Sequence, residues 1–307
     1  MLVDGMFDMQ EIIVHGVNGR KWHVSGPRAG DEGVIVSPKM KNVIDAPVKT
    51  FWIPSAQSSA YQGKKWLRRD PMYTFIINGN SPGHWREIDS EFRQSFDYAD
   101  EAVMEHKTGD GSRYLGVRLL SEPKAYETLP WEGKDPHLYG DASLLIPGAC
   151  ENPHYMGRTL ASSYTIQSGT SGSANLPFWN EGDVEMWLEY VIIGPPTGNK
   201  GIWTLPDFSW QDDAGAARTV TLPQIVQADG TVTVLTRQSQ EQLVSSNKTG
   251  FWPRAAGKRF IYPVPKHTGT ALHPKFLPVS VTNAQPGCGV QVRFTPAFTR
   301  PFGMGKR

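Results

Sequence analysis

The stretch at residues 85–120 constrains the fold most, because its apolar spacing changes from helical to strand-like partway through. Its first part repeats apolar residues every three or four positions, which places on one helix face Trp85, Ile88, Phe92 and Phe96. After residue 100 apolar and polar residues alternate, as in a strand with one buried face. The turn at residues 108–111, TGDG, suits a tight hairpin because glycine accepts positive φ. The sequence predicts one long helix that leads into a β-hairpin.

Short β-rich segments separated by turn residues fill most of the remaining chain. The sequence holds 31 Gly and 24 Pro for turns, and its 10 Trp, 10 Tyr and 13 Phe supply apolar material for a core. The main predicted strands are residues 11–14, 21–24, 47–53, 71–78, 183–194, 201–205, 219–222, 231–236, 260–264, 277–282 and 289–294. This pattern predicts a mainly β protein, with an N-terminal β-sandwich-like module that carries the helix and hairpin and a C-terminal jelly-roll sandwich.

The length predicts two domains rather than one large β domain. At 307 residues the chain is about twice the typical length of one domain, roughly 150 residues. Residues 162–175, SSYTIQSGTSGSAN, are rich in Ser, Gly and Thr, as linkers often are. We therefore expect domains at residues 1–165 and 166–307, and we expect the second to fold without the first.

Charge and composition exclude several classes of protein. The net charge of +1 gives no reason to expect a nucleic-acid or anionic-membrane surface. The first 16 residues carry acids and no basic lead into an apolar run, so we expect no signal peptide and synthesis in the cytoplasm. No apolar run approaches the ~20 residues needed to span a bilayer, so no membrane partner is expected.

A polar, basic arm at residues 55–70 is too long for an ordinary hairpin loop. Its cations surround one aromatic residue, and the five residues of interest are Lys64, Lys65, Trp66, Arg68 and Arg69. One interpretation is a contact arm for a protein partner, because long ordered loops are often retained for contacts. The other is a solvated loop held by its single tryptophan. The sequence leaves both interpretations open.

No residue pattern predicts catalysis, a metal site or a cofactor. Cys150 and His154 form one pair, but no second pair at zinc-ligand spacing accompanies them. We expect Cys150 and Cys288 to be two separate buried thiols; a disulfide and a thiol nucleophile are the alternatives. A carboxylate pair for glycoside hydrolysis would come from the helix and its exit, at Glu87, Asp89, Glu91 and Glu101. Their positions favour a solvated surface instead.

Several passages, taken in order, resemble one protein family. The helical run REIDSEFRQSFD and the hairpin TGDGSRYLGVRL resemble the helix and hairpin of siphophage distal tail proteins. The later DPHLY and LLIPGACENP are similar to the passage that follows this hairpin in the family. The run NEGDVEMWLEY and the following Gly194-Pro195 resemble the opening of the second domain in tail proteins of actinobacterial phages. The resemblance departs from the family at His154-Tyr155 and at Leu188.

The resemblance implies a structural protein of the virion tail tip. Distal tail proteins form a ring, usually a hexamer, that joins the tail tube to the baseplate hub or tail-associated lysin. The resemblance assigns ring formation to the N-terminal domain and gives the C-terminal domain a galectin-like or jelly-roll fold. The implied partners are other copies of the chain, the tail tube protein, the hub or lysin and other minor tail proteins. The arm at residues 55–70 then supplies candidate ring contacts.

Two alternative functions remain open at this point. A carbohydrate-binding module for the host cell-wall glycan would stack sugars on exposed aromatic rings of the second domain, for which the candidates are Trp203, Trp210 and Trp252. A glycosidase is the third reading. It would require the helix carboxylates to act as an acid pair, and the sequence favours a structural, non-enzymatic protein over both.

Overall fold

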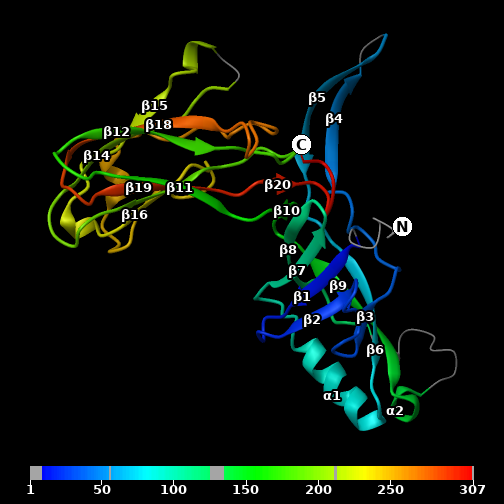
Figure 1. Ribbon diagram of the computed structural model, residues 1–307. Coiled ribbons are helices and arrows are strands. Elements are labelled where there is room, and N and C mark those ends of the chain that lie inside the picture. The colour runs from blue at the N-terminus through cyan, green and yellow to red at the C-terminus, as the bar shows by residue number, and fades with distance from the viewer. Residues whose placement is uncertain (1–8, 55–56, 125–134, 211–212, 306–307) are drawn as a thin grey trace, which may run out of the picture. The chain divides into compact units, whose positions relative to one another are not determined.

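The computed structural model describes residues 9–54, 57–124, 135–210 and 213–305 (Figure 1). The chain forms two compact units. Unit 1 comprises the chain up to Gly157 together with Phe298–Met304, and unit 2 comprises mainly Arg158–Ala297. The segment Phe298–Met304 thus follows unit 2 in the sequence but belongs to unit 1. Residues 55–56 of the basic arm and residues 125–134 lie outside the described residues.

Unit 1 is built from one large sheet, a separate hairpin and one long helix. Its elements are β1 (Glu11–His15), β2 (Lys21–Ser25), β3 (Val34–Val36), β4 (Val48–Pro54), β5 (Ser59–Trp66), β6 (Met72–Asn78), α1 (Pro82–Arg93), β7 (Ala102–Thr108), β8 (Gly111–Leu119), α2 (Pro136–Tyr139), β9 (Asp141–Ala149) and β10 (Tyr155–Met156). The sheet runs in the order β2-β1-β7-β8-β9-β6-β3, and β10 adds to β8 and pairs with β20 (Ala297–Phe298).

Helix α1 packs on this sheet through the predicted apolar face. Trp85, Ile88 and Phe92 are buried, and the Phe92 ring makes edge contacts with Trp22 of β2 at 5.2 Å and Phe75 of β6 at 4.8 Å. The Ser81 hydroxyl accepts a hydrogen bond from the third residue of the helix, and proline occupies the first turn, where its missing N–H costs nothing. The predicted helix and the β7–β8 hairpin that follows it are confirmed.

Unit 2 is a sandwich of two antiparallel sheets. Its elements are β11 (Leu160–Thr165), β12 (Gly172–Phe178), β13 (Glu189–Ile193), β14 (Lys200–Pro206), β15 (Thr219–Thr221), β16 (Val232–Leu235), β17 (Leu243–Ser245), α3 (Phe251–Arg254), β18 (Lys275–Ala284) and β19 (Gly289–Phe294), with 3₁₀ turns at Asp213–Gly215 and Gln227–Asp229. One sheet has the order β11-β19-β13-β16-β17 and the other β12-β18-β14-β15. Buried residues of both sheets share one core, so the mainly β fold class is confirmed.

The structure differs from the predicted elements at three places in unit 2, the first being the predicted strand at residues 260–264, which forms only an isolated bridge at Val264. The predicted strand at residues 183–194 is a strand only over Glu189–Ile193, because the residues before it make a single bridge between Met186 and Val264. The predicted linker at residues 162–175 instead runs through β11 and into β12, which belong to opposite sheets. Its alternating small polar residues lie on half-exposed strands. The predicted boundary after residue 165 thus falls at the end of β11, inside unit 2.

Both cysteines are free thiols in different cores, as expected: Cys150 in unit 1 and Cys288 in unit 2. Burial raises the pKa of the Cys150 thiol from 9.0 to about 12, which keeps it protonated at neutral pH and removes its nucleophilic character. None of the helices among the described residues is long and apolar enough to cross a bilayer.

Candidate functional site

The β4–β5 hairpin is the most unusual surface of unit 1, because it exposes apolar side chains along its length. It extends beyond the other strands of unit 1 (Figure 1), and apart from the half-buried Gly63 and Trp66 its described residues are exposed. Trp52 is 55% exposed, Ile53 56% and Tyr61 52%. Soluble proteins seldom leave a cluster of large apolar side chains in water unless a partner covers it.

The hairpin also leaves strand edges without partners. Among the described strands β4 and β5 pair with each other and with no third strand, so each presents one edge of unpaired backbone groups. A two-stranded hairpin is only marginally stable in water without further packing. Cross-strand contacts help to hold it, since Trp52 pairs in register with Tyr61 and their rings meet at 5.3 Å. A partner that pairs with a free edge and covers the rings would satisfy the unpaired backbone groups and bury the exposed apolar surface.

Cations dominate the charge of this hairpin. Residues 46–69 contain no acidic residue, whereas Asp45 and Asp70 flank them. Lys49 lies over the Phe51 ring at 5.7 Å, and Lys64 lies over the Trp66 ring at 4.6 Å. No ion pair between described residues involves Lys49, Lys64 or Lys65. The hairpin therefore offers apolar contact together with uncompensated positive charge.

The structure corrects the sequence-based view of the arm at residues 55–70. Most of it is not a loop but strand β5, whose alternation carries no burial signal because both faces are exposed. Lys64, Lys65 and Arg68 are exposed, and Arg68 forms an ion pair with Asp70 at 2.7 Å. Trp66 is half-buried and its ring meets that of His154 edge-on at 4.7 Å.

Arg69 is excluded as a surface contact, because it is fully buried. Its guanidinium donates to the backbone carbonyl oxygens of Pro153 at 2.7 Å, Val43 at 2.5 Å and Thr299 at 2.9 Å. A buried guanidinium requires such acceptors, and these come from distant parts of the sequence. Arg69 therefore holds the base of the hairpin in place and does not reach a partner.

The aromatic residues Phe51, Trp52 and Tyr61 form the part of this surface that the sequence analysis missed. The signal was available in the sequence: bulky rings stand in β-rich segments without any acidic residue nearby. The segment at residues 47–53 was predicted as a strand but was assigned no surface role. A strand with apolar residues on both faces reads as buried until its pairing is known.

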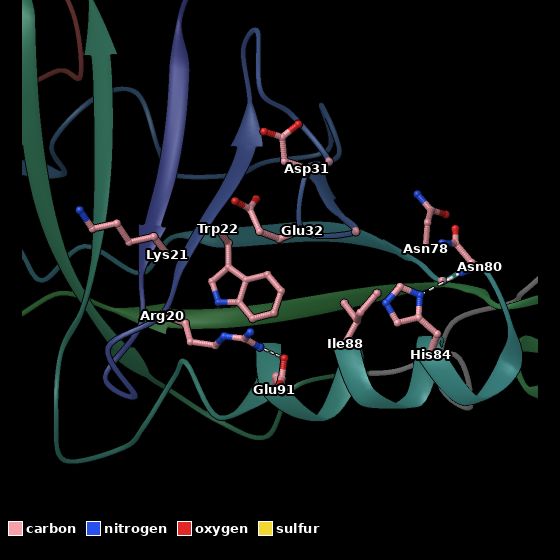
Figure 2. Close-up of a pocket in the computed structure, with 13 residues that line it drawn as sticks. Arg20, Lys21, Trp22, Asp31, Glu32, Asn78, Asn80, His84, Ile88 and Glu91 are labelled. Atoms are coloured by element: carbon pink, nitrogen blue, oxygen red, sulfur yellow. Dashed lines mark hydrogen bonds and ion pairs between the residues drawn. The ribbon is translucent and has the colours of Figure 1, made fainter.

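A cavity of about 480 Å³ lies where β2, the turn before β3 and α1 meet (Figure 2). Its lining mixes both signs of charge, and Arg20 forms an ion pair with Glu91 across it. The His84 ring accepts a hydrogen bond from the Asn80 N–H at 3.2 Å. Asp31 and Glu32 pair with Arg28 and His23, which do not line the cavity, and no hydroxyl or thiol side chain is among its lining residues. We assign no chemistry to this cavity.

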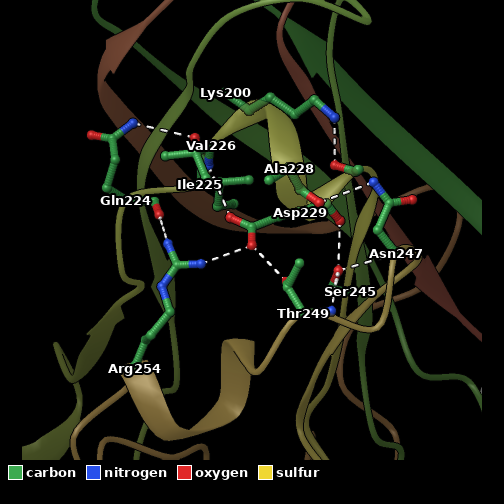
Figure 3. A network of polar contacts seen from close by, with 11 residues as sticks. Lys200, Gln224, Ile225, Val226, Ala228, Asp229, Ser245, Asn247, Thr249 and Arg254 are labelled. Carbon is green, nitrogen blue, oxygen red and sulfur yellow. Dashed lines mark hydrogen bonds and ion pairs between the residues drawn. The ribbon is translucent and has the colours of Figure 1, made fainter.

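The polar network around Asp229 in unit 2 is structural (Figure 3). The fully buried carboxylate accepts hydrogen bonds from the Val226 N–H at 2.9 Å and the Thr249 hydroxyl at 2.6 Å, and it pairs with Arg254 at 2.7 Å. Burial raises the pKa of Asp229, but the hydrogen bonds and the guanidinium lower it by more, so the net shift is downward. The network ties the 3₁₀ turn at Gln227–Asp229 to Thr249 and to α3, and both oxygens of the carboxylate have partners within it.

The carboxylates considered for glycoside hydrolysis do not form an acid pair. Asp89 pairs with Arg93 at 2.8 Å, Glu91 pairs with Arg20, and Glu101 lies 3.4 Å from Arg118. Three of the four carboxylates are thus held by arginines, and the fourth, Glu87, is exposed on the helix surface. Within the described part of the chain no group of three or more metal-ligating side chains comes together either.

Trp203 is excluded as a sugar-stacking residue, because it is fully buried between the sheets of unit 2 and its ring N–H donates to the Lys200 carbonyl oxygen at 2.8 Å. Trp210 and Trp252 are partly buried and pack against the same core. Trp210 meets the Phe208 ring edge-on at 5.4 Å. Sugar stacking on these two residues stays a prediction.

Comparisons with known proteins find phage tail proteins that are similar to this chain. No known protein family's sequence profile matches the chain. The chain is 23% identical over 351 aligned positions to the minor tail protein Gp27 of Mycobacterium phage L5, covering 99% of this chain and 100% of that protein. It is 22% identical over 348 positions to minor tail protein Gp27 of Mycobacterium phage D29, with the same coverage.

Solved structures show the same fold over nearly the whole chain. The SPP1 Dit (gp 19.1) protein, described as a hub adsorption apparatus of phages that infect Gram-positive bacteria, matches with a TM-score of 0.58 and 12% identity, covering 94% of this chain and 99% of Dit. A chain of the phage P2 baseplate in its activated conformation matches with a TM-score of 0.54 and 10% identity, covering 94% and 98%. The chain thus has a Dit-like fold, and the resemblance to siphophage distal tail proteins is confirmed.

Proposed function

We propose that this chain is a structural subunit of a phage tail tip. It forms a closed ring, hexameric as in the family it resembles, that joins the tail tube to the baseplate hub or tail-associated lysin. The names of its relatives support a structural role in the tail, and the Dit-like fold supports a place at the hub. The role is non-enzymatic, and other minor tail proteins are its further partners.

The observation that carries ring formation is the exposed β4–β5 hairpin of unit 1. A closed ring repeats one heterologous contact until it meets its own start, and a hairpin with free edges and exposed rings provides one half of such a contact. Stable assemblies commonly bury about 2,000 Å² or more at each interface. The rings supply apolar area, and the lysines steer the register against acids of the neighbouring copy.

Helix α1 offers one such acid on the described surface of unit 1. Glu87 is exposed and takes part in no ion pair among the described residues, whereas Asp89 and Glu91 are already paired with arginines. Among these three acids, Glu87 is therefore the one that we propose meets the lysines of a neighbouring copy. Arg68, which pairs with Asp70 in the same chain, contributes less than Lys64 and Lys65.

Replacing one exposed ring of the hairpin tests the proposal. Trp52→Glu adds a charge to the apolar surface without removing any core contact, so it should weaken self-association at least about tenfold. Leu272→Glu, at an 87% exposed apolar residue of unit 2, is the matched control and should associate like the unchanged chain. Light scattering over a concentration series measures the association. Negative-stain images of the unchanged chain should show rings with a central hole.

A strictly monomeric full-length chain at high concentration would overturn ring formation by this chain on its own. Equal loss of association in both variants, or in Leu272→Glu alone, would move the contact away from the hairpin. High salt should weaken association of the unchanged chain, because the lysine contacts are screened.

A further inference from the structure

The segment Phe298–Met304, which follows unit 2, contacts both ends of the β4–β5 hairpin. We call these ends its feet: residues 45–47 before β4 and residues 67–69 after β5. One carbonyl oxygen, that of Thr299, accepts hydrogen bonds from the Ala46 N–H and from the Arg69 guanidinium, each at 2.9 Å. Ala46 lies just before β4 and Arg69 lies just after β5. The next residue, Arg300, forms an ion pair with Asp45 on the first foot. A single short stretch of chain therefore bridges the two ends of the hairpin.

A second buried arginine holds the same segment. Arg113 of β8 is 3% exposed and donates to the carbonyl oxygens of Arg300 at 2.8 Å and Gly303 at 2.5 Å. Its guanidinium carbon lies 3.6 Å from the centre of the Phe298 ring. At the turn between β7 and β8 the Asp110 carboxylate accepts a hydrogen bond from the Gly303 N–H at 2.9 Å. The segment is thus fixed along its length.

These contacts make unit 1 dependent on a segment that follows unit 2 in the sequence. Arg69 and Arg113 are charged groups in a core, and such groups are stable there only when their N–H donors have acceptors. Part of the acceptors comes from residues that follow unit 2 in the sequence, 230 positions after Arg69 and 190 positions after Arg113. Without that segment Arg69 loses the Thr299 acceptor, and Arg113 loses the Arg300 and Gly303 acceptors together with the Phe298 ring that it packs against.

We infer that Phe298–Met304 act as a strap that completes unit 1 and fastens the base of the β4–β5 hairpin. The hairpin carries its exposed rings in a fixed direction only when both feet are tied. Because the strap follows unit 2 in the sequence, unit 1 becomes competent for assembly only after unit 2 has been synthesised. This last step rests on the proposed role of the hairpin in ring formation, whereas the fastening itself does not.

Hydrogen–deuterium exchange on two shortened chains tests the strap. A chain that ends at Ala297 lacks it, and a chain that ends at Met304 keeps it and serves as the matched control. Peptides covering residues 42–54 and 59–70 should exchange at least about tenfold faster in the chain ending at Ala297 and at the unchanged rate in the control. Peptides from β16 and β17 of unit 2 should keep their rates in both chains.

Two full-length variants test the strap even if the chain that ends at Ala297 does not fold. Arg300→Glu places a carboxylate against Asp45 and should speed exchange of residues 42–47 about threefold. Arg293→Glu makes the same change at a similarly exposed arginine of unit 2, beside Glu189, and should leave those peptides unchanged. Unchanged exchange of the hairpin feet in the chain ending at Ala297 would overturn the strap.

The exchange measurements are made at dilutions where the chain is monomeric, so they do not depend on ring formation. Hairpin feet that loosen in a protein that never forms rings would support the strap and count against the proposed function. A chain ending at Ala297 that forms normal rings with normal exchange would remove the strap and leave the proposed function standing.

Discussion

Two neighbouring arginines, Arg68 and Arg69, show how far single residues can be interpreted from sequence. They look alike in a basic run, and both are expected to contact a partner. In the structure one is exposed and paired with Asp70, while the other is fully buried and donates to carbonyl oxygens 26 to 230 residues away. Sequence spacing predicts local pairs, but it cannot reveal acceptors that only tertiary structure brings together.

We predict that substitutions of these two residues differ in their effect on the free energy of unfolding. Arg69→Met removes a buried guanidinium and takes one donor from each of the carbonyl oxygens of Pro153, Val43 and Thr299, so the free energy of unfolding of unit 1 should fall by about 2–4 kcal/mol. Arg68→Met should change it little, because that side chain is exposed. Urea unfolding followed by tryptophan fluorescence compares the two. Equal effects would contradict the assigned roles.

A pH dependence follows from His106, which is fully buried beside the Tyr155 ring and hydrogen-bonded to Gln10. Burial, with a smaller contribution from the Arg69 charge, lowers its pKa from 6.5 to about 3. Between pH 6.5 and about pH 3 the His106 ring therefore binds a proton in the unfolded chain but not in the folded chain. The stabilising contribution is complete above pH 6.5 and is lost as the pH falls toward 3.

His106→Gln should remove this dependence. Between pH 6.5 and pH 5 the unchanged chain should lose about 2 kcal/mol more of its free energy of unfolding than the variant does. Urea unfolding at both pH values, under the same salt conditions, measures the difference. Parallel losses in the two proteins would show that His106 does not carry the effect.

Among the helices and strands, those with a local sequence signal were the ones that could be predicted. Helix α1 and the β7–β8 hairpin were predicted because each has one buried face and a turn or cap encoded nearby. Strand β5 was predicted as a loop because neither face is buried, so alternation gave no contrast. The candidate site was found only in part for the same reason: its lysines were identified, but its exposed rings were not.

The contact between α1 and the start of β3 supplies an element-scale prediction. Gly33 has a φ of +82°, and a Cβ there would lie 2.6 Å from Ile88 of the helix and 2.7 Å from the Asn78 carbonyl oxygen. Gly19 has nearly the same φ, +80°, with open space around it. Gly33→Ala should therefore cost about 2 kcal/mol more than Gly19→Ala, which carries only the backbone strain of about 1 kcal/mol. Thermal unfolding of both variants decides it.

For the whole molecule, each unit has its own core, so unit 2 should fold separately. The fragment at residues 158–297 should unfold cooperatively, because it retains both sheets. A fragment at residues 176–307 lacks β11 and more than half of β12, so it should aggregate or lose cooperativity. Chemical unfolding of the two fragments tests this, and equal stability would show that β11 is dispensable.

The composition suggested a domain boundary after residue 165, which lies later in the sequence than the end of unit 1 at Gly157, because small polar residues suit exposed strands as well as linkers.

The chain leaves unit 1 after β10 and re-enters it at β20, and these two short strands pair with each other. The exit and the entry are thus neighbours at one place on unit 1. Replacing the stretch of the gene that encodes residues 158–297 would therefore leave unit 1 with the same closely spaced ends, whatever fold lay between them. Unit 2 could be exchanged as a whole while unit 1, including Phe298–Met304, kept its own sequence.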